Sequence, residues 1–196
     1  IKESSAQTVL ALQKRGIQTF IGDVWESKYQ DRFFDVVTLW HSLEHMTEPL
    51  RVIAEVQRIL KDDGVMIIAV PNWDSWERKM FGPHWFHLDV PRHQYHFSQS
   101  TLAGLLEARG FQIEKIQRIA PEYDFYSVTQ SFLNLLFPNE PNALYSFLNG
   151  GKKAGLKHML AFTWLVPLSV VIVFTSWVLK TSGTIEVTAR KRQTTH

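Results

Sequence analysis

FDVVTLWHSLEHMTEPLRVIAEVQRILKDDGVMIIAVPN, residues 34–72, is the stretch that decides the fold of this chain. Its first part, Asp35–Trp40, is mainly apolar and β-branched, which is typical of a parallel strand buried on both faces. Thr47 can cap a helix that accepts Pro49 in its first turn, where no backbone hydrogen bond is lost. We predict that Gly64 ends this helix and that Val65–Val70 forms a second buried strand.

Two strands joined by one helix predict a right-handed crossover unit, and therefore a parallel strand pair in an α/β sheet. Ligands of open α/β sheets bind at the carboxyl ends of the strands. The segment Trp40–His45 follows the first strand directly. We therefore expect the functional site there.

Shorter patterns predict the remaining elements. A weakly amphipathic helix should cover residues 6–13, and a second helix should begin at Ser98 and end at Gly110. Three further strands are predicted, at Ile17–Ile21, Phe111–Ile119 and Thr184–Arg190. Gly22 and Asp23 follow the first of these strands, where they would also suit a plain turn.

Composition narrows the classes of function. The chain has 196 residues and a net charge of +2, which is too small to indicate a nucleic-acid partner. It has no cysteine, which excludes disulfides and thiolate metal sites and is consistent with a cytoplasmic protein. We predict one domain over residues 1–196 and leave its oligomeric state open.

Aromatic and histidine side chains crowd the loop after the second strand, WDSWERKMFGPHWFHLDVPRHQYHFS, residues 73–98. Loops this aromatic commonly cover a pocket or join a partner. Histidine titrates near neutral pH and can take a proton from a hydroxyl group. Each of these histidines could equally serve only the packing of the loop.

A hydrophobic helical insertion is expected at residues 123–181. Within it, Met159–Leu179 carries no charged residue over a length close to that of a membrane-spanning helix. The strands on either side should be neighbours in one sheet, so a single crossing would separate them. We therefore predict membrane association through residues 159–179 without a single crossing, and keep a buried helix pair or a dimer interface as the alternative.

The quoted motifs, taken in order from Ile1 to about Ile119 and again from Gly183, resemble the class I S-adenosylmethionine-dependent methyltransferases. The nearest branch is that of the ubiquinone-pathway O-methyltransferases, where a W-F-x-L-D-x-P-R-H-x-x-H-F-S pattern recurs. The resemblance implies an α/β, Rossmann-like methyltransferase sheet. No Gly-x-Gly pair occurs in the chain, so we expect the first two strands and the glycine-rich cofactor loop to lie upstream, and the fragment to be inactive alone.

The resemblance also implies roles for individual residues. S-adenosylmethionine would be bound by Asp23, Val24, Trp40 and His41, with Asp23 accepting a hydrogen bond from the adenine amino group. The predicted catalytic residues are His93, as the base, and His45. The acceptor, a small or lipid-linked molecule methylated on oxygen, would contact Trp85, Arg92 and Tyr95. We predict no metal site, because His41 stands where an acidic residue is usual in that branch.

Two alternatives remain open from the sequence. His41-Ser42-Leu43-Glu44-His45 fits the H-x-x-E-H pattern of an inverted zinc-peptidase motif, which needs both histidines on one helical face. Pro49, shortly after His45, argues against a helix of the necessary length. The second alternative is a non-catalytic, membrane-associated relative, and in either case Glu44 and His45 could simply begin the following helix.

Overall fold

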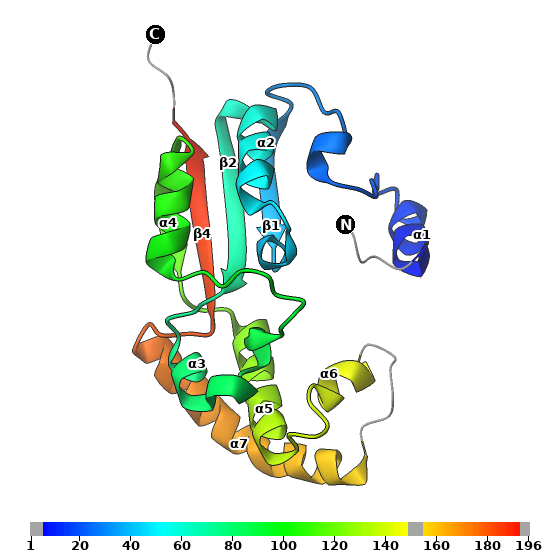
Figure 1. Ribbon diagram of the computed structural model, residues 1–196, viewed down its shortest axis with the longest axis vertical. Coiled ribbons are helices and arrows are strands. Elements are labelled where there is room, and N and C mark those ends of the chain that lie inside the picture. Colours follow the sequence, from blue (N-terminus) through cyan, green and yellow to red (C-terminus); the bar gives the residue numbers. More distant parts are fainter. Residues whose placement is uncertain (1–5, 149–154, 193–196) are drawn as a thin grey trace.

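A computed structural model describes residues 6–148 and 155–192. Its centre is a four-stranded sheet with the strand order β1-β2-β4-β3 (Figure 1). Strand β1 is parallel to β2, whereas β4 runs antiparallel to both β2 and β3. This arrangement confirms the predicted α/β sheet and the crossover unit. The strands are β1 (Phe34–Trp40), β2 (Leu60–Pro71), β3 (Phe111–Gln117) and β4 (Thr184–Lys191).

Seven α-helices and four short 3-10 helices are described around this sheet. The α-helices are α1 (Ala6–Lys14), α2 (Pro49–Ile59), α3 (Trp76–Phe81), α4 (Gln99–Ala108), α5 (Pro121–Leu136), α6 (Ala143–Leu148) and α7 (Leu156–Val178). The 3-10 helices are η1 (Val24–Glu26), η2 (Leu43–His45), η3 (Gly82–His84) and η4 (Phe86–Leu88). Figure 1 shows α2 and α4 in front of the sheet, and α5–α7 beyond the carboxyl ends of β1 and β2.

The main core lies between the sheet and the helices α2 and α4. Helix α2 contributes Val52, Ile53 and Val56, which recur at helical spacing and are all buried. They pack with Leu102 and Leu106 from α4 and with inward side chains of the central strands β2 and β4. Burial of this continuous apolar layer fixes the orientation of β1 and β2, and with it the direction in which their carboxyl ends point.

The start of α2 is as predicted at Pro49, but its cap and its end are not. Glu48 occupies the N-cap position, so the prediction that Thr47 caps the helix is wrong. The helix ends at Ile59, because Leu60 is already extended and buried as the first residue of β2. Gly64 therefore does not end a helix. It lies in an irregularity of β2, where an added Cβ would approach the Lys61 carbonyl oxygen to 2.9 Å.

Ile17–Ile21 does not form the predicted strand. Among the described residues no strand lies beside it, so its backbone has no ladder to join. The chain instead continues to η1, whose residues Val24 and Trp25 pack against the main core. The Arg51 guanidinium lies 4.1 Å above the centre of the Trp25 ring, which ties η1 to α2.

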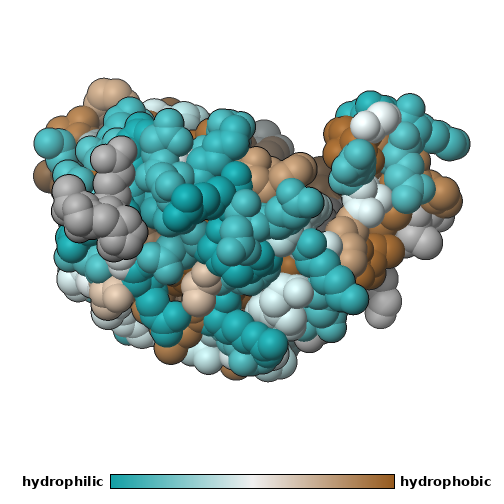
Figure 2. Space-filling view, turned by 90° about the horizontal axis from the view of Figure 1, so that it is seen from above, coloured by the Kyte–Doolittle hydropathy of each residue, from teal (hydrophilic) through white to brown (hydrophobic). Residues whose placement is uncertain are grey.

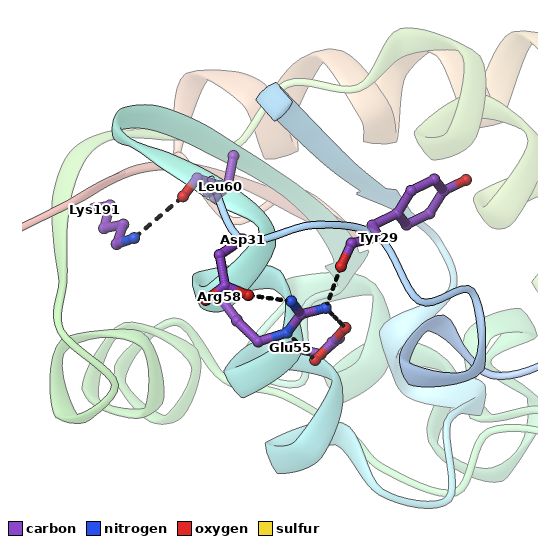
Figure 3. Close-up of polar contacts among 6 residues, drawn as sticks. All are labelled: Tyr29, Asp31, Glu55, Arg58, Leu60 and Lys191. Atoms are coloured by element: carbon purple, nitrogen blue, oxygen red, sulfur yellow. Dashed lines mark hydrogen bonds and ion pairs between the residues drawn. The ribbon is translucent and has the colours of Figure 1, made fainter. Parts of the chain in front are cut away.

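Arg58, near the end of α2, holds the segment that precedes β1 (Figure 3). Its guanidinium donates to Glu55 within the helix, pairs with Asp31, and donates to the Tyr29 carbonyl oxygen at 2.8 Å. At the start of β2, the Leu60 carbonyl oxygen accepts a hydrogen bond of 3.1 Å from Lys191, the last residue of β4. These contacts secure both ends of the connection between α2 and the strands.

A second, smaller core joins α3, α5 and α7. Phe81, Trp85, Val128, Ile172 and Val173 are its buried members. Helices α5 and α7 pack along each other and connect β3 to β4, so the predicted helical segment before the last strand is present. Because α5 begins beside the sheet, its first turn lies next to the end of β1, where Tyr123 contacts Trp40.

Candidate active site

A cavity of about 230 Å³ lies at the carboxyl end of β1. It is lined by residues that follow β1, by the aromatic loop after β2, and by two tyrosines from the helices between β3 and β4. The lining residues are His41, Glu44, His45, Phe86, His87, Asp89, Arg92, His93, Tyr123 and Tyr145. A polar cavity thus lies where the crossover unit predicts a ligand site.

Backbone hydrogen bonds join the two loops that form most of the cavity. His41, directly after β1, has a left-handed backbone (φ 43°), and its N–H donates to the Ala69 carbonyl oxygen of β2 at 2.9 Å. The Glu44 carbonyl oxygen accepts from the N–H groups of Gln94 and Tyr95, at 2.8 and 3.2 Å. The chain therefore turns sharply out of β1 and docks η2 onto the aromatic loop.

Glu44 is the acidic group at the centre of this arrangement. Its side chain is only 1% exposed, and neither carboxylate oxygen has a hydrogen-bond partner among the described residues. The nearest cationic candidates are His41 Nδ1, at 3.4 Å, and His93 Nε2, at 4.0 Å. A buried carboxylate without hydrogen bonds is costly, so Glu44 is well suited to accept a bond from a bound group or from a protonated histidine.

His93 and His45 are oriented by carbonyl groups on the outer side of the cavity. His93 Nδ1 lies 2.7 Å from the His87 carbonyl oxygen, and His45 Nδ1 lies 3.1 Å from that of Arg92. A carbonyl can only accept, so we assign the proton to Nδ1 in both rings, which leaves each Nε2 with a free lone pair. The two rings meet edge to face with centroids 4.6 Å apart.

Burial affects the charge of these histidines. It lowers the pKa of His93 below the usual 6.5, and the bond to the His87 carbonyl and the nearby Glu44 charge oppose this effect only in part. Burial also lowers the pKa of His87, assisted by the proximity of His41 and His93. Both rings are consequently neutral at pH 7, and His93 can act as a proton acceptor there.

Tyr123 closes the cavity from α5. Its hydroxyl accepts from Trp40 Nε1 at 2.7 Å, and its ring lies 4.2 Å from that of His41. His41 also stacks on His87, with centroids 5.7 Å apart. Through these contacts the end of β1, the aromatic loop and α5 form one wall.

The predicted site residues are distributed over three places. His41, His45, Arg92 and His93 line the cavity, and Trp40 adjoins it through Tyr123. Asp23 and Val24 lie at η1, outside the cavity lining.

Two predicted acceptor contacts lie elsewhere. Trp85 is 2% exposed and belongs to the smaller core, so it packs the aromatic loop onto α5 and does not face the cavity. Tyr95 is exposed and donates to the Thr47 carbonyl oxygen at 3.3 Å. In this arrangement both residues support the loops around the site.

Sequence reasoning missed six lining residues: Glu44, Phe86, His87, Asp89, Tyr123 and Tyr145. Glu44 and His87 stand within motifs that were recognised, and only their burial reveals their position. The two tyrosines come from helices far from β1 in the sequence, since Tyr123 already lies 83 residues after Trp40. No spacing pattern links them to His41, since the approach depends on how α5 and α6 pack.

The residues at the end of β1 and at η1 are consistent with half of an S-adenosylmethionine site. Asp23 offers a carboxylate for an amino-group donor, and the buried Nε2 atom of His41 has no hydrogen-bond partner within the described part of the chain. Trp40 supplies a half-exposed aromatic face beside it. The chain contains no Gly-x-Gly sequence that could form a glycine-rich cofactor loop.

The zinc-peptidase alternative does not agree with the local geometry. Leu43–His45 forms a single 3-10 turn, and His41 lies outside it with a left-handed backbone. The two histidines of the motif therefore do not share a helical face. A different group, Glu44, His45 and His93, has ligand atoms within 4.8 Å of one another and could hold a divalent ion.

Comparisons with known proteins agree on one family. The family model described as "Methyltransferase domain" matches residues 7–116, more than half of the chain. A curated relative from Mycolicibacterium smegmatis, named a probable S-adenosylmethionine-dependent methyltransferase, is 29% identical over 96 residues, or 47% of this chain and 34% of the relative. The chain thus spans about a third of the length of that protein.

Solved structures share the fold at low sequence identity. The [4+2]-cyclase SpnF superposes with a TM-score of 0.56 at 21% identity, over 96% of this chain and 62% of the cyclase. Phosphoethanolamine N-methyltransferase 2 from Haemonchus contortus, solved with S-adenosylhomocysteine, superposes with a TM-score of 0.55 at 15% identity, over 95% of this chain and 41% of the enzyme. The matching family model, together with the Rossmann-like sheet, shows that this chain belongs to the methyltransferase domain family, whose membership supports S-adenosylmethionine as the cofactor.

Proposed function

We propose that the full-length protein transfers the methyl group of S-adenosylmethionine to a hydroxyl oxygen of a small or lipid-linked acceptor. The observation that supports this most is the cavity at the carboxyl end of β1, in which His93 Nε2 and the unbonded Glu44 carboxylate face each other at 4.0 Å. The fold alone would not suffice, because a cyclase shares it.

The residues present account for the steps that the protein must perform. Asp23 and Val24 at η1, with Trp40 and His41 at the end of β1, would hold the cofactor, which would supply a methyl carbon activated by its sulfonium. The cavity orients the acceptor hydroxyl and limits the access of water. His93 takes the hydroxyl proton at Nε2 as the oxygen attacks, and the buried Glu44 carboxylate stabilises the imidazolium that forms.

His45 and Arg92 have supporting roles in this proposal. His45 lies beside His93 and presents a second unprotonated Nε2, so it can accept a hydrogen bond from the acceptor. The Arg92 guanidinium lies at the rim of the cavity, near Asp89 and Tyr145. Tyr145 comes from α6, next to exposed apolar residues of the same helix. This favours an acceptor with a hydrophobic part.

The test compares two histidine variants of the full-length protein. His93→Asn keeps a donor for the His87 carbonyl oxygen but removes the base, so turnover should fall by about 10²- to 10⁴-fold. His96→Gln is the control, because His96 bonds to the Leu88 carbonyl oxygen and does not line the cavity. Turnover is measured as transfer of labelled methyl groups from S-adenosylmethionine into a solvent extract of cell membranes.

Cofactor binding is measured separately by calorimetric titration. Both variants should bind S-adenosylmethionine like the wild type, since neither residue is assigned to the cofactor. Failure of the wild-type full-length protein to bind the cofactor at millimolar concentration would rule out the proposed function. Equal turnover of the two variants would remove His93 from its proposed role.

A further inference from the structure

Helix α7 has one face that is exposed along its whole length and an opposite face that is buried at its start and over its second half. Residues 158–179 contain no Asp, Glu, Lys or Arg. In the most apolar 18-residue stretch of α7 only 22% of the residues are buried. The buried side chains, among them His158, Ser169, Ile172 and Ser176, recur on the face that packs against α5. The exposed side chains on the opposite face form what we call the outward stripe: Leu156, Leu160, Trp164, Val171, Phe174 and Val178. Trp164 is 83% exposed.

Both ends of α7 are tied to the same helix, α5. At the beginning, His158 is buried against the Phe137 ring, 4.6 Å between centroids, just beyond α5. At the other end, Trp177 Nε1 donates to the Asp124 carboxylate in the first turn of α5 at 2.7 Å. Since α7 lies lengthwise on α5, a bilayer cannot separate its two ends. A single crossing by α7 alone is therefore excluded, which leaves a hairpin formed with α5 or a position parallel to the membrane surface.

The outward stripe offers little for a protein partner to bind. Interfaces between proteins usually contain about one hydrogen bond per 100–200 Å² and a polar rim. The threonine hydroxyls on this side are already bonded to their own helix, Thr163 to the Met159 carbonyl oxygen at 3.1 Å and Thr175 to that of Val171 at 2.8 Å. Polar groups in a hydrocarbon environment must form their hydrogen bonds within the protein in this way, because no water is available there. Trp164 carries the one ring N–H of the stripe, and tryptophan is enriched where membranes meet water.

Pro167 is consistent with a shallow position. It lacks an N–H group, so the Thr163 carbonyl oxygen loses its usual partner four residues later. That oxygen would be costly in the centre of a bilayer but can reach water at the interface. The opposite end of the molecule, which Figure 2 shows, is mainly hydrophilic, with α7 on the side away from the viewer.

We propose that α7 is an in-plane membrane anchor, with the outward stripe buried in the interface of a lipid bilayer and α5 packed on the opposite face. The contact is apolar and independent of methyl transfer. It would place the cavity, through Tyr145 on α6, within reach of acceptors that reside in the membrane. That consequence rests on the proposed function, whereas the anchor itself does not.

Flotation with phosphatidylcholine vesicles tests the anchor in the full-length protein. Because the lipid is neutral and the driving force apolar, the protein should float with the vesicles at both low and high salt. The variant Trp164→Gln/Phe174→Gln should partition into vesicles about tenfold more weakly for each replaced side chain. Glutamine is a good helix former, so α7 should persist, which circular dichroism checks.

The matched control is Leu10→Gln/Ile119→Gln, which replaces two exposed apolar residues away from α7 and should float like the wild type. A wild type that stays with the soluble fraction would overturn the proposal. So would a soluble dimer, detected by analytical ultracentrifugation, that the Trp164→Gln/Phe174→Gln variant dissociates, because the stripe would then bind a second copy. None of these outcomes depends on activity, so failure of the anchor and failure of methyl transfer are distinguishable.

A labelling experiment decides between an in-plane and a spanning helix. The sequence has no cysteine, so Ser146→Cys before α7 and Lys180→Cys after it each introduce a single exposed thiol. With the protein added to sealed vesicles, an impermeant maleimide should label both positions equally from outside. Protection of one position alone would show that α7 crosses the bilayer, and the in-plane anchor would be wrong.

Discussion

At the scale of single residues, the proposed chemistry depends on the contact between His93 and Glu44. The rate should fall in acid as His93 becomes protonated, with a midpoint below the usual histidine pKa of 6.5 because burial lowers it. The Glu44 charge raises the pKa of His93. Glu44→Gln should therefore move the midpoint of kcat/KM to still lower pH and reduce the maximum. An unchanged midpoint in the pH profile would show that Glu44 does not affect the pKa of the catalytic base.

Asp23 carries the prediction for the cofactor. If its carboxylate accepts from the adenine amino group, Asp23→Ala should weaken binding of S-adenosylmethionine by roughly 1.5–3 kcal/mol, as expected for a charge-assisted hydrogen bond. Calorimetric titration of the full-length protein measures the change, and Asp74→Ala, in an exposed loop, is the control. Equal affinity of the two variants for S-adenosylmethionine would show that Asp23 does not bind the cofactor and serves only as the residue that precedes η1.

At the scale of elements, a buried carboxyl group joins α3 to α5 and β4. Glu77 accepts from Ser127 Oγ at 2.8 Å, and an added Cβ at Gly183 would approach its oxygen to 2.4 Å. Burial, reinforced by the Asp124 charge, raises the pKa of Glu77 to about 8. The folded protein therefore binds a proton that the unfolded chain releases near pH 4.5, and this contribution to stability is lost as pH rises from about 4.5 to 8.

Glu77→Gln should remove that dependence. The neutral amide resembles the protonated acid, so the variant should match the wild type at pH 4 and be more stable at pH 9, by on the order of a few kcal/mol. Urea unfolding at several pH values measures both curves. Glu122→Gln, at an exposed position of α5, should follow the wild type throughout. Parallel curves for Glu77→Gln and the wild type would show that Glu77 is ionised in the fold.

Helices and strands were predictable from the sequence where the local residue pattern and the burial of the side chains favour the same structure. The strands β1 and β2 and the helix α2 follow from apolar spacing and Pro49, and α4 begins with the predicted Ser98 cap, whose hydroxyl accepts from Thr101 N–H at 3.1 Å. The end of α2 was not predictable, because burial of Leu60 stops the helix before the glycine signal at Gly64. Ile17–Ile21 has strand composition, but a strand also needs a neighbour to pair with.

At the scale of the whole molecule, sequence indicated the site only in part. His41, His45, Arg92 and His93 line the cavity because they flank the carboxyl ends of β1 and β2. The walls supplied by Tyr123 and Tyr145 depend on how α5 and α6 pack, and a one-dimensional pattern does not contain that information. The same holds for α7: its composition indicates an apolar environment, but only its packing along α5 excludes a single crossing.

The antiparallel pairing of β3 and β4 has a consequence for how such a protein can diversify. Gln117 and Glu186 are partners in the sheet, joined by a side-chain hydrogen bond of 2.7 Å. The chain therefore leaves the sheet after Gln117 and returns to it at Thr184, close to the same point, where a short hairpin could close the chain. That single stretch carries both the tyrosine wall of the cavity and α7. Under the proposed function and the proposed anchor, recombination at this point would transfer acceptor choice and membrane contact together, and would leave the residues proposed to bind the cofactor untouched.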